Sequence, residues 1–155
     1  MTTPYQLELD RVVVDTREQD PLFGPPARVA KLDTGDYSIV GCEGLIALER
    51  KTLPDMLGCI GRDRERFERE LERSRQLSYF AIVIETDLYL LRGPYERSLV
   101  APTAVIGSLT AWSVRYGVPI WLTSDRRGAK GVIYRLLRAF AKEIDESEKK
   151  SLDSG

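Results

Sequence analysis

Short runs rich in β-branched residues alternate along this chain with segments that repeat apolar residues at helical spacing, and this alternation restricts the fold most. Strands are predicted over 11–15, 35–40, 45–51, 80–85 and 118–123. Helices are predicted over 52–76, with an interruption near 58–61, and over 102–115 and 129–144. The proline-rich residues 19–31 are predicted to form a loop. This order predicts an α/β fold in which a mixed β-sheet is flanked by helices on both faces.

The length of 155 residues predicts a single domain over 1–145, followed by a polar and disordered tail over 146–155. The longest purely apolar run, residues 80–84, is too short to cross a membrane, and the first residues lack the pattern of a secretory signal. Two cysteines are too few for a disulfide scaffold, and their spacing fits no zinc motif. We therefore expect a cytoplasmic protein with no membrane partner and no organic cofactor.

The chain contains no histidine. This excludes serine and cysteine hydrolases that use histidine as the base, zinc hydrolases with histidine ligands, and histidine-based nucleases. Any acid–base or metal chemistry must instead use carboxylates, lysine, tyrosine or cysteine.

The charges are unevenly distributed along the chain. Residues 1–60 hold 10 acidic and 6 basic side chains, whereas residues 61–138 hold 9 acidic and 14 basic ones. Of the 23 basic residues, 17 are arginine, which binds phosphate in a bidentate manner. The pattern fits a cation site beside an anionic ligand. An arginine-rich codon preference, with charges scattered for solubility, explains the composition equally well.

Residues 35–51, GDYSIVGCEGLIALERK, are predicted to form a β-hairpin. A turn centred between residues 42 and 43 places Tyr37 opposite Leu48 and Ile39 opposite Ile46. One face of the ribbon is then consistently apolar. Because a one-residue slip would reverse the faces, this agreement supports the register.

The other face of the predicted hairpin places Asp36 opposite Glu49. Directly opposed residues have Cβ atoms about 4.5–5.5 Å apart, where like charges are destabilising. Lys51 shares this face, whereas Arg50 points to the opposite one. Two facing carboxylates therefore require a cation.

Carboxylate oxygens suit Mg²⁺ or Mn²⁺, which usually retain water and substrate phosphates as further ligands. Such a metal lowers the pKa of a bound water and stabilises charge on a phosphorane. Lys51 would then position or deprotonate the water, or neutralise the transition state. The alternative is a structural salt bridge in which Lys51 joins the two acids.

Three segments occur together in the order of a known signature. GDY at 35–37 and ERKTLPD at 49–55 resemble the G-D-x(n)-E-R-K-x-x-x-D signature of the XPF/Hef structure-specific DNA endonucleases, and VVVDTRE at 12–18 resembles their V-D-x-R-E segment. The resemblance covers residues 11–145. It implies the restriction-endonuclease-like fold of the PD-(D/E)xK group, with Glu49 and Lys51 in the E-x-K element.

The resemblance also implies roles for particular residues. The metal-binding carboxylates would be Asp15, Asp36 and Glu49, and Lys51 would be the catalytic lysine. The residues that organise the site or contact phosphate would be Arg17, Glu18, Arg50 and Asp55.

Structural alternatives exist for four of these residues. Asp15 would simply end a strand, and Asp55 would cap its own helix. Glu18 would be solvated in a loop. Arg50 would reach the metal site only through a twist or bulge after Glu49.

The segment 62–75, RDRERFERELERSR, predicts a helix with an arginine face. At about 100° per residue, four arginines lie within about 60° of one another: Arg62, Arg66, Arg69 and Arg73. We expect Arg62, Arg66 and Arg69 to bind DNA phosphates. Arg73 is expected on a solvated face held by ion pairs, which is also the alternative for the whole helix.

Together these observations predict a Mg²⁺- or Mn²⁺-dependent DNA endonuclease that hydrolyses phosphodiesters with a metal-activated water. The resemblance implies branched DNA as substrate, in repair or recombination, and a homodimer formed through the nuclease domain. A prokaryotic or phage protein of this kind would associate with the nucleoid. The helix-hairpin-helix module that usually accompanies the domain is not found in the 155 residues. The alternative is a non-catalytic DNA-binding subunit of a nuclease complex.

Overall fold

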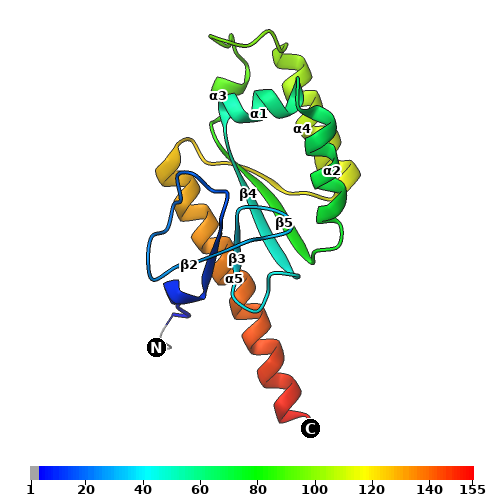
Figure 1. The fold of residues 1–155 in the computed structure, drawn as a ribbon. Coiled ribbons are helices and arrows are strands. Elements are labelled where there is room, and N and C mark those ends of the chain that lie inside the picture. The colour runs from blue at the N-terminus through cyan, green and yellow to red at the C-terminus, as the bar shows by residue number, and fades with distance from the viewer. Residues whose placement is uncertain (1–3) are drawn as a thin grey trace.

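A mixed β-sheet forms the centre of the computed structural model, which describes residues 4–155 (Figure 1). Its six strands in the described residues are β1 (Val12–Asp15), β2 (Arg28–Ala30), β3 (Tyr37–Ile39), β4 (Ile46–Thr52), β5 (Tyr79–Glu85) and β6 (Ile120–Leu122). Their order in the sheet is β2-β1-β3-β4-β5-β6. Strand β3 is antiparallel to β1 and β4, whereas the remaining neighbours are parallel.

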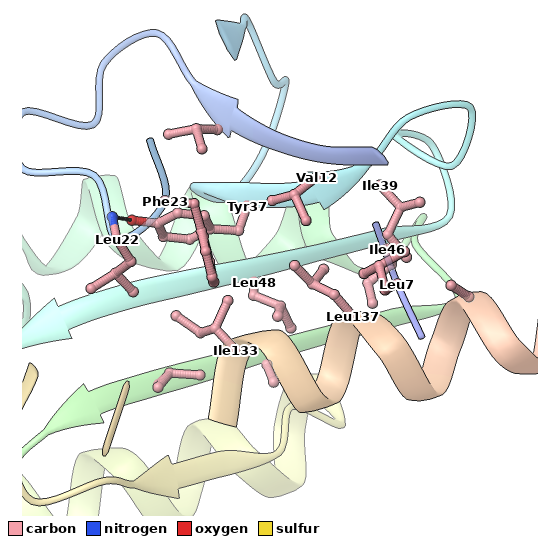
Figure 2. Close-up of a cluster of buried hydrophobic side chains, with 14 of the residues drawn as sticks. Leu7, Val12, Leu22, Phe23, Tyr37, Ile39, Ile46, Leu48, Ile133 and Leu137 are labelled. Atoms are coloured by element: carbon pink, nitrogen blue, oxygen red, sulfur yellow. Dashed lines mark hydrogen bonds between the residues drawn. The ribbon is translucent and has the colours of Figure 1, made fainter. Parts of the chain in front are cut away.

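Helices cover both faces of this sheet. They are α1 (Leu53–Ile60), α2 (Arg64–Ser74), α3 (Leu88–Leu91), α4 (Pro102–Tyr116) and α5 (Arg126–Asp153), and a short 3₁₀ helix spans Leu9–Arg11. Ile133 and Leu137 of α5 pack on the face that carries Tyr37 and Leu48 (Figure 2). Helices α1, α2 and α4 pack on the opposite face. The predicted α/β fold with a mixed, doubly covered sheet is therefore confirmed.

The hairpin has the predicted register, since Tyr37 pairs with Leu48. Its entry depends on Gly35, which adopts a φ of +82°. A Cβ atom at this position would lie 2.8 Å from the Cβ of Ala47. Only glycine therefore allows the chain to enter β3 this close to β4.

The alternation of side chains along β4 decides which residues reach which face. Ile46 and Leu48 point into the core beneath α5, and Ala47 points into the core beneath α1 and α2. Continuing this period, Glu49 and Lys51 face the side of α1 and α2, and Arg50 faces the side of α5.

The interrupted helix predicted over 52–76 is present as α1 and α2, separated by a turn. Thr52 caps α1 by accepting a hydrogen bond from the Asp55 N–H at 3.3 Å. On α4, which was predicted over 102–115, Val105, Leu109 and Trp112 are buried. These elements have strong caps or regular apolar spacing, which explains why sequence patterns locate them.

Three features differ from the sequence-based expectation. Strand β2 lies within the predicted loop 19–31, and α3 was not predicted. Helix α5 begins before residue 129 and continues through the polar residues 146–153, which were expected to be disordered. This last part runs past the sheet (Figure 1) and is largely exposed, so no apolar periodicity marks it. Within residues 4–155, no helix is both long enough and apolar enough to span a membrane.

Candidate active site

A cavity of about 320 Å³ opens between the sheet and α2, and it is called here the acidic cavity. Acidic and basic side chains dominate its walls. The residues that line it are Asp15, Arg17, Asp33, Thr34, Gly35, Asp36, Glu49, Lys51, Cys59, Asp63, Arg66, Phe67, Glu70 and Arg73. The cavity therefore brings together residues from all three segments of the sequence signature.

The hairpin supplies the centre of the acidic cavity. Asp36 lies just before β3 and accepts a hydrogen bond from the Arg50 N–H at 2.8 Å. Glu49 is 4% exposed, and its Oε1 lies 3.0 Å from the Lys51 Nζ. The Lys51 ammonium also lies 5.5 Å from the centre of the Phe67 ring on α2. The predicted juxtaposition of Asp36, Glu49 and Lys51 on one face of the sheet is present.

Burial and mutual repulsion disfavour the ionised form of both carboxylates. Burial raises the pKa of Asp36 to about 6, although the hydrogen bond from Arg50 opposes the shift. Burial also raises the pKa of Glu49 well above its usual range, and the charges of Asp36 and Glu70 add to this effect. Burial lowers the pKa of Lys51, but the neighbouring Glu49 outweighs it and raises that pKa above its ordinary value.

These donors are chemically suited to Mg²⁺ or Mn²⁺, since both ions prefer carboxylate oxygens. A cation would also offset the repulsion that raises the two carboxyl pKa values. Among the described residues, however, no group of three or more acidic or cysteine side chains is arranged closely enough to hold a metal ion. The metal-binding roles of Asp15, Asp36 and Glu49 therefore stay predictions.

Asp15 lines the acidic cavity, but its carboxylate already has several partners. It accepts hydrogen bonds from the Leu32 N–H at 2.7 Å and from the Arg17 Nε at 2.8 Å. Burial raises the pKa of Asp15, but these donors outweigh that effect and bring it below its ordinary value. In this arrangement, Asp15 and Arg17 hold the segment after β1 against the sheet.

Glu18 and Arg50 belong to an ion-pair network on the other face of the sheet. Arg50 Nε lies 2.6 Å from Glu85 Oε1, and its guanidinium lies 3.5 Å from Glu18 Oε2. It also donates a hydrogen bond to the carbonyl of Asp20. The Tyr37 hydroxyl donates to Glu18 at 2.9 Å. The structure therefore confirms the opposite orientations of Arg50 and Lys51, and neither Arg50 nor Glu18 lines the acidic cavity.

Asp55 is exposed in the first turn of α1 and does not line the acidic cavity. Its N–H group bonds to Thr52, as expected of a residue that starts a helix. A catalytic role for Asp55 stays a prediction, and the capping position explains its place in the fold.

Helix α2 forms the second wall of the acidic cavity. Arg66, Glu70 and Arg73 line the cavity at one-turn intervals, whereas Arg62 and Arg69 do not. The DNA-binding roles of Arg62, Arg66 and Arg69 stay predictions, with Arg66 the one that the structure places at the cavity. The sequence analysis did not consider Glu70. It placed Arg73 on a solvated face, and Arg73 is exposed, but it also lines the cavity. The spacing of Glu70 and Arg73 from Phe67 could have indicated that they lie near the sheet, because Phe67 anchors this side of the helix in the core.

A restriction-endonuclease-like sheet that places the signature residues Asp36, Glu49 and Lys51 in one cavity defines an XPF-type nuclease domain. Residues 14–136 match the ERCC4 domain, and the chain belongs to this family. The resemblance inferred from the signature is thereby confirmed.

Solved structures show the same fold. The structure of XPF from Aeropyrum pernix has 25% sequence identity and a TM-score of 0.65, covering 83% of this chain and 60% of that one. A structure of XPF from Aeropyrum pernix in complex with DNA has 21% identity and a TM-score of 0.66, covering 86% of this chain and 65% of that one. This chain therefore spans less than two thirds of the length of either. No curated protein matches it significantly in sequence.

Proposed function

We propose that the domain is a Mg²⁺- or Mn²⁺-dependent endonuclease that hydrolyses phosphodiester bonds in DNA. The observation that carries this proposal is the meeting of Asp36, Glu49 and Lys51 in the acidic cavity, with arginines on its walls. Membership of the ERCC4 domain family supports the proposal.

Each group of the acidic cavity has a distinct chemical role in this proposal. Asp36 and Glu49 would hold the divalent cation, which supplies an activated water and stabilises charge on the phosphorane. Lys51 supplies a positive charge toward the phosphate, because Glu49 favours its ammonium form. Phe67 covers the Lys51 ammonium on the helix side and limits its freedom.

Three arginines on the walls of the cavity are suited to the phosphates on either side of the scissile bond. Arg17 lies on the sheet side, and Arg66 and Arg73 lie on α2. Arg66 and Arg17 are largely exposed, so their guanidinium groups are accessible to DNA. Arg62 and Arg69 would extend this contact along the helix. The existence of an XPF structure in complex with DNA supports the assignment.

The resemblance to XPF and Hef suggests finer features of the activity. We propose that the substrates are branched DNA, such as flaps, forks or junctions in repair or recombination, and that the active form is a homodimer. The protein would then act in the cytoplasm, and at the nucleoid if it is prokaryotic or phage-encoded.

A non-catalytic DNA-binding subunit is the second candidate function. It is favoured by one observation: within residues 4–155, the acidic side chains form no ready metal site. Glu49 is paired with Lys51, and Asp15 with Arg17. Such a subunit would bind DNA through the same arginines without cutting it.

Cleavage of labelled linear, flap, fork and four-way-junction DNA separates the two functions. The reaction is run with Mg²⁺, with Mn²⁺ and with EDTA. We expect metal-dependent cutting by the wild type and at least a hundredfold loss in Lys51→Ala, since Lys51 acts at the phosphate. Lys142→Ala, an exposed lysine of α5, is the matched control and should cut normally.

The outcomes of this experiment have separate meanings. Binding of DNA without cutting at any metal concentration would favour the non-catalytic subunit. Absence of both binding and cutting would overturn the proposed function. Ranking of the substrates by the wild type tests whether this domain alone prefers branched DNA.

A further inference from the structure

The N-terminal part of α5 has a charge pattern that the stability of the helix does not explain. Residues 126–138 hold five basic side chains and no acidic one, whereas residues 143–153 hold five acidic and two basic ones. The dipole of a helix favours acidic side chains near its N-terminus and basic side chains near its C-terminus. The charges of α5 have the opposite order, so another interaction must account for them.

Three arginines of this part form a surface that is called here the α5 stripe: Arg127, Arg135 and Arg138. At about 100° per residue, they lie within about 80° of one another, outside the sector of α5 that packs into the core. Arg127 and Arg135 are exposed, and Arg138 is partly exposed. The Arg138 guanidinium lies 5.6 Å from the centre of the Tyr134 ring, which limits its freedom.

The arginines of the α5 stripe differ from those of α2 in having no acidic neighbours. On α2, Arg64 lies 2.8 Å from Glu68, and Arg66 lies 3.4 Å from Asp63. Along α5, no acidic residue lies three or four positions from any arginine of the stripe. Within residues 4–155, none of these three arginines forms an ion pair. The stripe therefore presents positive charge to a partner outside the domain.

Gly131 lies in the middle of the α5 stripe, where packing does not require a glycine. At Gly128, a Cβ would lie 1.9 Å from the Thr123 carbonyl oxygen, so the start of α5 does require one. At Gly131, a Cβ would lie 3.4 Å from the Nη1 atom at the flexible end of Arg135, an ordinary contact distance. Glycine inside a helix is less stable than alanine. At this position it leaves the helix surface open beside the arginines, where a phosphate can approach closely.

The α5 stripe and the acidic cavity belong to opposite sides of the molecule. Helix α5 covers one face of the sheet, and α2, which forms a wall of the cavity, covers the other (Figure 1). A straight duplex cannot contact both sides of the sheet at once. A branched DNA has arms that diverge from one point, so two of its arms can pass on the two sides.

We infer that the α5 stripe binds the phosphate backbone of a second duplex arm while the first arm occupies the acidic cavity. This inference rests on the proposed function and assigns a surface to its branched substrate. Guanidinium groups are suited to phosphate oxygens, and the stripe is about 16 Å long, enough for several successive phosphates. Because one DNA molecule joins the two contacts, each raises the effective concentration of the other. The stripe thereby favours branched over linear DNA.

DNA binding in EDTA tests the inference without requiring cleavage. Fluorescence anisotropy compares a fork with a linear duplex of the length of one arm, at several salt concentrations. Arg127→Gln/Arg135→Gln removes two charges from the stripe and introduces residues that favour helices. Lys149→Gln/Lys150→Gln removes two charges from exposed positions of the same helix outside the stripe, which makes it the matched control.

We expect the wild type and the control to bind the fork about tenfold more tightly than the linear duplex. The stripe variant should lose this advantage, because the second arm loses its contacts. The slope of log Kd against log salt for the fork should fall by about 1.8, since each phosphate contact contributes about 0.9. Affinity for the linear duplex should change less than about threefold, because that duplex keeps the acidic cavity.

Gly131→Glu is a second variant that keeps the fold, because glutamate favours a helix more than glycine does. It places a negative charge in the middle of the stripe, so it should also bind the fork about tenfold more weakly than the wild type. Gly131→Ala is its control and should keep the preference for the fork. Thermal unfolding shows whether each variant retains its structure.

Equal fork affinity of the stripe variant and the wild type would overturn the inference and leave the proposed endonuclease intact. Equal losses on the fork and on the linear duplex would also overturn it. A wild-type dimer that dissociates in the stripe variant, measured by light scattering, would assign the stripe to a second copy of the chain instead. Absence of DNA binding and of cleavage in the wild type would overturn the proposed function, and the inference with it.

Discussion

Arg50 and Lys51 are neighbours in the sequence, but they serve opposite faces of β4. Lys51 enters the acidic cavity, whereas Arg50 joins Glu18 and Glu85 on the side of α5. This division follows from the two-residue period of a strand. It explains how one signature segment provides both Lys51, the proposed catalytic group, and Arg50, which fixes the surrounding structure. Through Glu18 and the Asp20 carbonyl, Arg50 holds the segment that follows β1.

Replacement of Arg50 should therefore affect stability. Only 8% of its side chain is exposed, and the Glu18 and Glu85 side chains are nearly as buried. Arg50→Ala leaves two buried carboxylates without their partner, so we expect the free energy of unfolding to fall by about 3 kcal/mol. Urea denaturation followed by circular dichroism measures this change.

Arg69→Ala is the control for this measurement, because Arg69 is exposed on α2 and forms no ion pair in the described residues. Its effect should stay below about 0.5 kcal/mol. If Arg50→Ala instead kept full stability and lost only cleavage, the positioning role would be contradicted and a direct role at the phosphate favoured.

At the scale of elements, the hairpin of β3 and β4 depends on a close approach at Gly35. Gly35 and Gly41 have nearly the same backbone conformation, with φ values of +82° and +85°. A Cβ at Gly35 would collide with Ala47, whereas a Cβ at Gly41 would meet nothing within 4 Å. Comparing substitutions at the two positions therefore distinguishes the cost of steric overlap from the cost of backbone strain.

We expect Gly35→Ala to lower the free energy of unfolding by about 3 kcal/mol and Gly41→Ala by about 1 kcal/mol. Both variants lose stability because alanine is strained in a left-handed conformation. The additional loss in Gly35→Ala is the cost of displacing Ala47 from β4. Urea denaturation of both variants tests this. Equal losses would show that β4 moves aside easily and that the close approach contributes nothing.

The elements also show what sequence patterns can and cannot locate. The register of the hairpin was predictable because Tyr37 and Leu48 are apolar partners on a buried face. Strand β2 was not, because all its residues are exposed and it pairs with β1 through the backbone. Glu70 was missed for a related reason: its place in the cavity comes from the packing of α2 beside Gly35, which the pattern of the helix alone does not encode.

At the scale of the whole molecule, the fold brings distant segments to a single cavity. Strand β1 ends at Asp15, the hairpin supplies residues 36–51, and α2 supplies residues 66–73. Strand β4 supplies Glu49 and Lys51 to the cavity, β5 supplies no residue to it, and α5 closes the opposite face of the sheet. The acidic cavity therefore depends on the packing of α1 and α2, and the sheet separates it from the core beneath α5.

The edge of the sheet formed by β6, at the other end from β2, is the best candidate for the proposed homodimer interface. Trp112 on α4 is fully buried in the core and is not available to such an interface. Trp121 and Leu122 on the edge strand β6 are instead about 40% exposed, and Val114 on the preceding helix is 87% exposed. Exposed apolar residues beside an open strand edge are typical of a surface that another chain covers.

We expect the wild type to be a dimer at micromolar concentration by light scattering coupled to size exclusion. Leu122→Glu should weaken it at least tenfold, because a buried, unpaired charge is costly at an interface. Val29→Glu is the matched control on the other edge strand, where Val29 is 69% exposed. A dimer lost in Val29→Glu and kept in Leu122→Glu would move the interface to β2, and a monomeric wild type would remove the dimer from the proposed function.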